Sequence, residues 1–230
     1  MRSNKLYTLV IRIASWSRIN FIAISHHTEN GLLQFADRRF VHYLPNPILA
    51  PTKQRKISSV HTIGFIARLI ELKGWKTFIK AARALPDYRF IIAGDGPDRP
   101  SIEAFLQENT IKNVELWGFV DPASKVFDEI DVFAFLSNNK EGMGLTHLEA
   151  TSVGIPVITT RTKATEEIFT DTKDCLMIDI DDTEAFVRAI QILASDSKLR
   201  NTIIQGGHKV YAQFSPDQYY KKLLQIYTNA

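Results

Sequence analysis

Short apolar runs alternate with helical patterns along most of the chain. Beyond residue 59 this rhythm predicts strands over residues 60–66, 88–93, 114–117, 132–136, 156–159 and 175–178. It predicts helices over residues 74–85, 100–109, 123–129, 145–153, 165–169, 182–194, 198–213 and 216–227. The runs Phe90–Ala93 and Val132–Leu136 are almost wholly apolar, which is typical of parallel strands covered on both faces. Six such strands predict an α/β domain with a doubly wound, Rossmann-like parallel sheet.

A shorter αβαβ pattern precedes this domain. It consists of an N-terminal helix, a strand at Asn20–Ser25, a helix at Thr28–Phe35 and a strand at Arg39–Leu44. The prolines that follow, in residues 45–51, can continue neither a strand nor a helix, so a boundary is expected near residues 45–59. We therefore divide the chain into residues 1–50, 51–215 and 216–230, and expect the last helix to pack back toward the N-terminal segment.

The N-terminal helix is predicted to be amphipathic and basic. Leu6, Leu9, Val10 and Ile13 share one face, and basic side chains surround it. Such a helix either lies on a membrane surface or packs its apolar face on its own domain, and we favour packing.

Composition indicates an ordinary soluble globular protein, with 45% hydrophobic and 23% charged residues. The net charge of +3 suits an anionic ligand or membrane surface, while no long Lys/Arg run indicates nucleic acid. No apolar stretch reaches the roughly 18 residues of a spanning helix. The single cysteine, Cys175, lies in an apolar run and is expected to be buried. We expect a cytoplasmic protein, with peripheral contact at the inner face of the membrane as an option.

Polar residues and glycines follow the predicted strands, where doubly wound sheets bind ligands. Arg68 and Lys73 flank a strand-to-helix turn and form either a diphosphate site or two solvated cations. The segment Gly94–Pro97 permits a close backbone approach or makes a simple turn. Phe119 and Val120 lie in a loop that either hydrogen-bonds a base edge or makes an ordinary turn.

The segment Glu141–Glu149 carries the strongest signal. Gly142 and Gly144 allow backbone N–H groups at the start of a helix to point at a phosphate. Because a carboxylate would be repelled by that phosphate, Glu141 and Glu149 are expected to accept hydrogen bonds from sugar hydroxyls. His147 lies between them and is expected to point elsewhere, as a core or solvated histidine. No histidine spacing predicts a metal site.

These segments together resemble a family. They are Gly64–Gly74, Gly94–Pro97, Gly118–Val120, Glu141–Glu149 and Gly154–Ile158. In order and spacing they resemble the retaining, nucleotide-sugar-dependent glycosyltransferases of the GT-B fold, of the group 1 or family 4 type. The resemblance covers roughly residues 20–228, and implies transfer of a sugar to a glycan or lipid-linked acceptor in cell-surface polysaccharide synthesis.

The resemblance also implies roles for individual residues. Arg68 and Lys73 would hold the donor diphosphate, and Glu141 would contact the donor sugar. The amides of Gly142, Met143, Gly144 and Leu145 would face the sugar and phosphates. Glu149 would bind the ribose, while Phe119 and Val120 would flank the base. The donor would be a UDP-, GDP- or ADP-sugar, and neither a metal nor another cofactor is implied.

The sequence departs from the family most in its size. Residues 1–44 resemble only the end of the acceptor domain that family members carry first, so most of that domain is absent from this sequence. Three hypotheses follow. The chain is one subunit of a split transferase whose partner chain carries an N-terminal GT-B domain, an inactive module that still binds nucleotide sugar, or a nucleotide-binding module without a transferase role.

Overall fold

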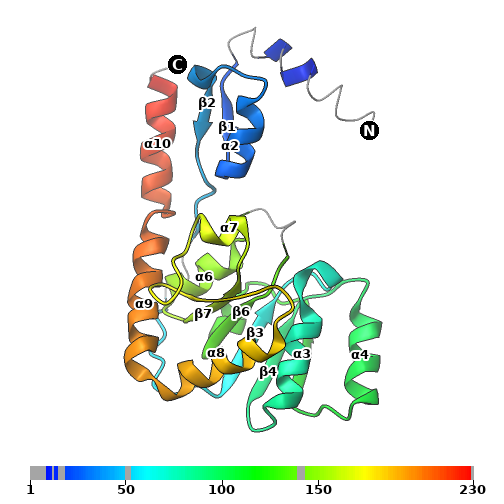
Figure 1. The fold of residues 1–230 in the computed structure, drawn as a ribbon. Helices are drawn as coiled ribbons and strands as arrows, with labels where there is room; N and C mark the ends of the chain where they lie inside the picture. Colours follow the sequence, from blue (N-terminus) through cyan, green and yellow to red (C-terminus); the bar gives the residue numbers. More distant parts are fainter. Residues whose placement is uncertain (1–8, 12, 15–18, 50–52, 139–142, 229–230) are drawn as a thin grey trace. The chain divides into compact units, whose positions relative to one another are not determined.

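The computed structural model describes residues 9–11, 13–14, 19–49, 53–138 and 143–228. Contacts along the chain define two compact units. The smaller unit combines residues 1–49 with residues 213–230, and the larger unit spans residues 50–212 (Figure 1). The division after residue 49 falls within the proline-rich segment.

The larger unit is built on a six-stranded sheet in which every neighbouring pair is parallel. Its strands are β3 (Thr62–Ile66), β4 (Arg89–Ala93), β5 (Val114–Gly118), β6 (Val132–Phe135), β7 (Val157–Thr160) and β8 (Leu176–Ile178). Their order is β5-β4-β3-β6-β7-β8. The predicted doubly wound sheet is thus confirmed, with the chain reversing its direction of travel between β3 and β6. In such sheets the crevice at this reversal is where ligands bind.

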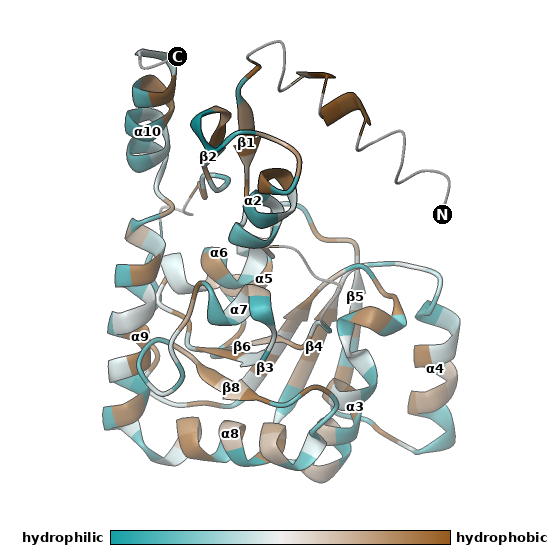
Figure 2. Ribbon diagram, turned by 45° about the horizontal axis from the view of Figure 1, so that its top comes forward, coloured by the Kyte–Doolittle hydropathy of each residue, from teal (hydrophilic) through white to brown (hydrophobic). Residues whose placement is uncertain are grey.

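Helices flank the sheet and bury aromatic side chains against it. They are α3 (Trp75–Ala84), α4 (Arg99–Glu108), α5 (Ser124–Phe127), α6 (Thr146–Ser152), α7 (Lys163–Glu166), α8 (Thr183–Ser195) and α9 (Ser197–Ala212). Phe78 on α3 contacts Phe90 of β4 at a ring-centroid distance of 5.1 Å and Phe186 of α8 at 6.2 Å. Helix α3 packs on α8, and α6 packs on α9. Figure 2 shows the strands between these helices as predominantly hydrophobic, as expected for a sheet covered on both faces.

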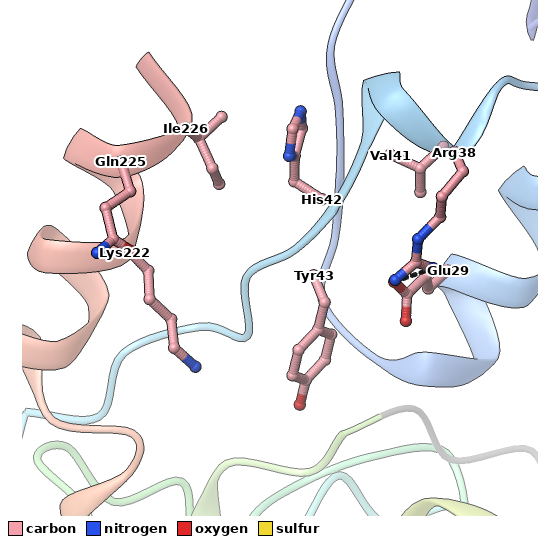
Figure 3. A pocket seen from close by; sticks show the side chains of 8 residues that line it. All are labelled: Glu29, Arg38, Val41, His42, Tyr43, Lys222, Gln225 and Ile226. Atoms are coloured by element: carbon pink, nitrogen blue, oxygen red, sulfur yellow. Dashed lines mark ion pairs between the residues drawn. The ribbon is translucent and has the colours of Figure 1, made fainter. Parts of the chain in front are cut away.

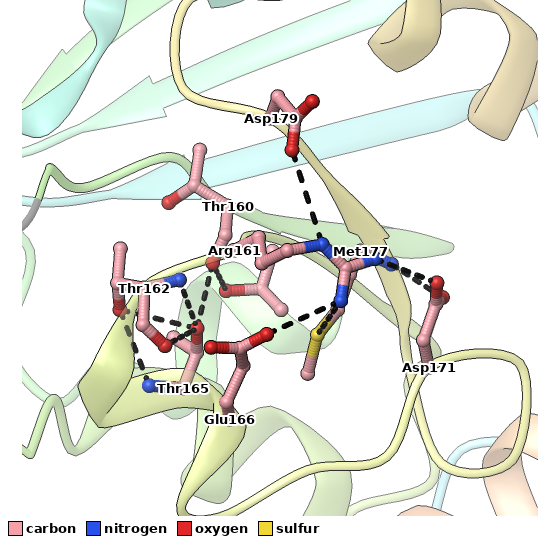
Figure 4. Close-up of polar contacts among 9 residues, drawn as sticks. Thr160, Arg161, Thr162, Thr165, Glu166, Asp171, Met177 and Asp179 are labelled. Carbon is pink, nitrogen blue, oxygen red and sulfur yellow. Dashed lines mark hydrogen bonds and ion pairs between the residues drawn. The ribbon is translucent and has the colours of Figure 1, made fainter.

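Helix α7 begins earlier than the sequence pattern predicts, at Lys163 rather than Thr165. The reason is a capping box, in which the Thr162 hydroxyl accepts from the Thr165 amide and Thr165 accepts from the Thr162 amide. Arg161, just before the cap, pairs with Glu166, Asp171 and Asp179 (Figure 4). These contacts tie the loop after β7 to both α7 and the end of β8.

The smaller unit contains β1 (Phe21–Ala23), α2 (His26–Leu33), a 3-10 turn (Arg38–Phe40), β2 (Val41–Tyr43) and α10 (Pro216–Thr228). Strands β1 and β2 form a two-stranded parallel sheet. Its hydrophobic cluster comprises Ile11, Ala23, Leu32, Ala36 and Val41. The Ile48 amide donates to the Phe214 carbonyl at 2.8 Å, which joins the segment after β2 to the start of α10.

The expectation that the N-terminal helix packs its apolar face on its own domain is wrong for the described residues. Leu9, Val10 and Ile13 are 54 to 56% exposed. Ile11, which the pattern did not place on that face, is the residue that joins the cluster. At 100° per residue Ile11 lies on the far side of the helix from the middle of the predicted stripe, so the buried face is nearly opposite to the predicted one.

Arg200 of α9 is buried and links three segments of the larger unit. Its guanidinium donates to the carbonyls of Leu193 and Ala194 in the last turn of α8, and to the Ser58 carbonyl at 2.9 Å. Since the last carbonyls of a helix lack intrahelical partners, this side chain satisfies acceptors that would otherwise be buried without a donor.

We expect Arg200→Met to lower the free energy of unfolding by about 2–4 kcal/mol, because it keeps the apolar stem but leaves buried carbonyls unbonded. Urea unfolding measures the change. Arg188→Met is the matched control, since Arg188 is exposed and pairs with the exposed Glu184 of its own helix. Equal effects of the two substitutions would contradict the capping role.

Candidate functional site

Two adjoining cavities lie in the larger unit, at the carboxyl ends of its central strands. The larger has a volume of about 470 Å³ and the smaller about 240 Å³. Both are lined by Ile66, Ala67, Arg68 and Thr146. The shared residues lie at the end of β3 and at the first position of α6, so the two cavities meet where the strand order reverses.

The larger cavity is mostly apolar and draws on three strand ends. Beyond the shared residues it is lined by Ala93, Gly94, Asp95, Phe119 and Val120. The Phe119 side chain is 80% exposed, whereas Val120 is half-buried. An apolar hollow with an exposed aromatic ring at its edge has the shape and chemistry of a site for a flat ring.

Close packing of backbones forms the floor of this cavity. Gly94 has φ +135°, and a Cβ there would lie 1.9 Å from the Ala67 carbonyl oxygen. Its amide donates to the Gly118 carbonyl. Because only glycine fits this position, the Gly94–Pro97 segment permits the close approach rather than making a simple turn.

The smaller cavity brings both predicted cations together. Arg68 lines both cavities and Lys73 the smaller one, along with Gly144 and Leu145 at the start of α6. Arg68 is exposed and has no ion-pair partner among the residues that the structure describes. Two cations beside a glycine turn are groups that diphosphate sites use in other proteins.

Glu149 lies one turn along α6, and its amide donates to the Leu145 carbonyl at 3.0 Å. It is not among the residues that line either cavity. The carboxylate is partly buried, and this desolvation raises its pKa. No ion pair or side-chain hydrogen bond of this carboxylate occurs within the described ranges, so its acceptor oxygens remain available to a ligand that reaches the helix.

The remaining predicted residues differ in what the structure says of them. Glu141 and Gly142 lie outside the described residues. Met143 has its side chain buried in the core, at 7% exposure, and does not line either cavity. Thr146 lines both cavities but was not among the predicted site residues. Its position directly after the glycine turn was the signal that could have found it.

His147 is a core residue, as one of the two predicted interpretations held. It is fully buried, and its ring meets Phe135 at a centroid distance of 4.3 Å and Phe169 at 4.9 Å. Burial, and after it the positive charge of Lys73, lowers the pKa of His147 to about 3. The ring is therefore neutral at physiological pH.

A further cavity of about 430 Å³ lies in the smaller unit. It is lined by Glu29, Arg38, Val41, His42, Tyr43, Lys222, Gln225 and Ile226. Glu29 is buried and pairs with Arg38 at 2.7 Å and with His26 at 2.8 Å. Lys222 of α10 extends toward the ring of Tyr43, 5.9 Å from its centroid (Figure 3). The polar groups here mainly satisfy one another.

The described residues hold neither a metal-binding cluster nor a membrane-spanning helix. Among them, no group of three or more His, Cys, Asp and Glu side chains is arranged to hold a metal ion. Within the same ranges, every helix is too short or too polar to cross a bilayer. Cys175 is buried as predicted, and burial raises the pKa of its thiol well above the usual range.

Comparison with known proteins identifies the family. The model of the glycosyl transferases group 1 matches residues 50–210, which include both cavities. The chain belongs to this family. The lipopolysaccharide core biosynthesis glycosyltransferase LpsE of Rhizobium meliloti is 30% identical over 92% of this chain and 58% of its own length. The 2-deoxystreptamine N-acetyl-D-glucosaminyltransferase of Niallia circulans is 28% identical over 73% of this chain and 45% of its own.

Solved structures show the same GT-B fold. Anabaena HepE, in complex with UDP and glucose, has a TM-score of 0.83 at 16% identity, covering 97% of this chain and 67% of its own. The C-terminal domain of the group 1 glycosyl transferase LpcC from Francisella tularensis has a TM-score of 0.61 at 27% identity. It covers 72% of this chain and 95% of its own. The chain spans about half the length of the curated relatives it matches.

The buried ring of His147 predicts a pH dependence of stability. An unfolded histidine titrates near pH 6.5, so between about pH 6.5 and 3 the unfolded chain binds a proton that the folded chain does not. The free energy of unfolding should therefore fall as the pH falls, by up to about 1.4 kcal/mol per pH unit from this ring.

We expect His147→Leu to make this decline shallower, as measured by urea unfolding at about pH 7 and about pH 4.5. His27→Leu, at an exposed ring, is the control and should leave the decline as it is. A leucine variant with the wild-type pH dependence would show that His147 does not contribute.

Proposed function

We propose that this chain is the donor-binding part of a retaining glycosyltransferase that transfers a sugar from a nucleoside diphosphate to a glycan or lipid-linked acceptor. The observation that carries the proposal is the lining of the two adjoining cavities, which places Arg68 at their junction and Lys73 in the smaller one. Membership of the glycosyl transferases group 1 supports it. So do structural neighbours described in complex with UDP and a sugar.

The donor would span both cavities. Its base would occupy the larger, apolar cavity beside Phe119 and Val120, and its diphosphate would meet Arg68 where the cavities join. The sugar would then extend into the smaller cavity beside Gly144 and Lys73. The UDP in the neighbours' descriptions favours a UDP-sugar over a GDP- or ADP-sugar.

The cations would serve the bond that breaks. When the bond between the anomeric carbon and the diphosphate oxygen cleaves, the electron pair leaves with the diphosphate, whose charge increases. Arg68 and Lys73 would stabilise that charge, which is the kind of interaction that lowers a reaction barrier most. The acceptor hydroxyl would form the new bond at the same carbon and lose its proton, which the departing diphosphate oxygen would accept. Protein cations would thus supply the charge neutralisation that a metal gives elsewhere.

The carboxylates would bind neutral parts of the donor. Glu149 is partly buried with its pKa raised by desolvation, so a ribose hydroxyl that donates to it would compensate for lost hydration. Glu141 would contact the donor sugar, and the amides of Gly142, Met143, Gly144 and Leu145 would face the sugar and phosphates. Two relatives are glycosyltransferases of lipopolysaccharide core and O-antigen biosynthesis, which favours a role for this chain in polysaccharide synthesis.

A second candidate is a nucleotide-sugar-binding module that acts only with a partner chain carrying an N-terminal GT-B domain. Exposed apolar side chains of the smaller unit, among them Leu49, Leu224 and Tyr227, favour it, because such residues occur at interaction surfaces. The smaller unit would join that partner. It holds eight Lys and Arg residues against three Asp and Glu, so it would also suit peripheral contact with the inner face of a membrane.

Binding of nucleotide sugars tests the proposal. We expect calorimetry with UDP-glucose, GDP-mannose and ADP-glucose to detect binding of at least one, because the cavities offer both an apolar ring site and two cations. Binding without transfer of the sugar to any acceptor tested would favour the module over the complete enzyme. No binding of any of the three at millimolar concentration would refute both.

Single substitutions test the residue assignments. Arg68→Ala and Glu149→Ala should each weaken nucleotide binding roughly tenfold or more, since a hydrogen bond to a charged group is worth about 1.5–3 kcal/mol. Arg188→Ala and Glu184→Ala, an exposed pair on α8, are the matched controls and should bind as the wild type does. Unchanged affinity in both site variants would show that the donor does not lie between them.

A further inference from the structure

Among the described residues, His147 is the buried side chain with the most polar atoms left without a hydrogen-bond partner. It is fully buried, and neither Nδ1 nor Nε2 has a hydrogen-bond partner in the part of the chain that the structure describes. A neutral imidazole carries one donor and one acceptor, and leaving both unbonded away from water destabilises the fold. A leucine would fill the same space without that cost.

The surroundings of the ring do not explain its polarity. Phe135 and Phe169 meet it edge to face at centroid distances of 4.3 and 4.9 Å. The charge of Lys73 acts on it from nearby and opposes protonation. An apolar residue would pack between two phenyl rings at least as well. Buried polar groups without partners are uncommon in native proteins, and they concentrate at functional sites.

The ring lies directly behind the wall of the smaller cavity. A Cβ on Gly144 would sit 2.9 Å from Cε1 and 3.1 Å from Nδ1 of His147. Gly144, Leu145 and Phe135 line that cavity together with the two cations. His147 therefore lies behind the turn at Gly144, next to the space that a ligand in the smaller cavity would occupy.

We propose that His147 is a positioning residue for donor binding, whose Nδ1 forms a hydrogen bond with the backbone of the Met143–Leu145 turn once the sugar diphosphate occupies the smaller cavity. Gly144 has φ +63°, in a region where glycine moves readily between conformations. The bond that is missing in the free protein would form on binding, so the turn would be held where its amides meet the donor. This inference rests on the proposed donor site.

The proposal makes stability and binding change in opposite directions. His147→Leu removes two unbonded polar atoms from the core, so the melting temperature should stay the same or rise. Affinity for UDP-glucose should nevertheless fall at least fivefold, about the value of one net hydrogen bond. His147→Asn keeps an amide near the position of Nδ1 and should recover most of the lost affinity.

Calorimetry with UDP-glucose and thermal unfolding are measured on the full chain for the wild type and each variant. Phe169→Leu is the control, because it alters the packing of the same ring without removing a nitrogen and should leave affinity within twofold. A lower melting temperature of His147→Leu would show that the ring is already bonded in the free protein, and would overturn the proposal.

Other outcomes separate this inference from the function on which it rests. If the wild type binds UDP-glucose and His147→Leu binds it equally well, the role of His147 is refuted while the donor site stands. If His147→Asn binds as weakly as His147→Leu, the shape of the ring matters rather than its hydrogen bond, and the proposal fails. If the wild type binds no nucleotide sugar, the donor site and this inference fail together.

Discussion

The close approach of three loop backbones at one edge of the sheet is the constraint on which the site depends. The loops after β3, β4 and β5 are joined by hydrogen bonds from Leu69 to Asp95, from Asp98 to Leu69 and from Gly94 to Gly118. Backbone groups that bond to each other in this way cannot shift independently. The shape of the cavity beside Arg68 is therefore set by main-chain geometry, and the side chains line it.

Within its described ranges, the larger unit contains both ion-paired and unpaired charged side chains, and the unpaired ones near the cavities bear on ligand binding. Ion pairs occur at several places on its surface, as in the bidentate contact of Arg89 with Glu115 that lowers the pKa of the carboxyl to about 2. Arg68 and Glu149, by contrast, have no ion-pair partner among the described residues. Such a cation and such a carboxylate would suit a ligand that bears both a phosphate and hydroxyl groups.

Much of the scaffold could be predicted from sequence because periodicity reports burial. The runs Phe90–Ala93 and Val132–Leu136 predicted buried parallel strands, and both became central strands of the sheet. Residues at strand ends, such as Arg68 and Phe119, could be assigned to one edge for the same reason. The capping box that starts α7 at Lys163 was missed, since propensity says less about ends than about interiors.

Contacts between distant segments could not be predicted. Nothing in the spacing around Arg200 indicates that its guanidinium bonds to the Ser58 carbonyl, 142 positions earlier. His147 has the pattern of any helix residue, and only its packing between Phe135 and Phe169 shows that its nitrogens are unbonded. The prediction of which face of the N-terminal helix is buried was wrong for a related reason. Periodicity identifies a stripe of apolar residues but not the surface that covers it.

The distribution of exposed apolar side chains has a practical consequence. Within the described ranges, ten of the fourteen large apolar residues at the surface belong to the smaller unit, including Leu49, Leu224 and Tyr227. Both cavities of the proposed donor site belong wholly to the larger unit. Most of the exposed apolar surface and the proposed ligand site therefore lie in different units. Substitutions that raise solubility can be confined to residues 19–49 and 213–228, without changing the residues that would bind a nucleotide.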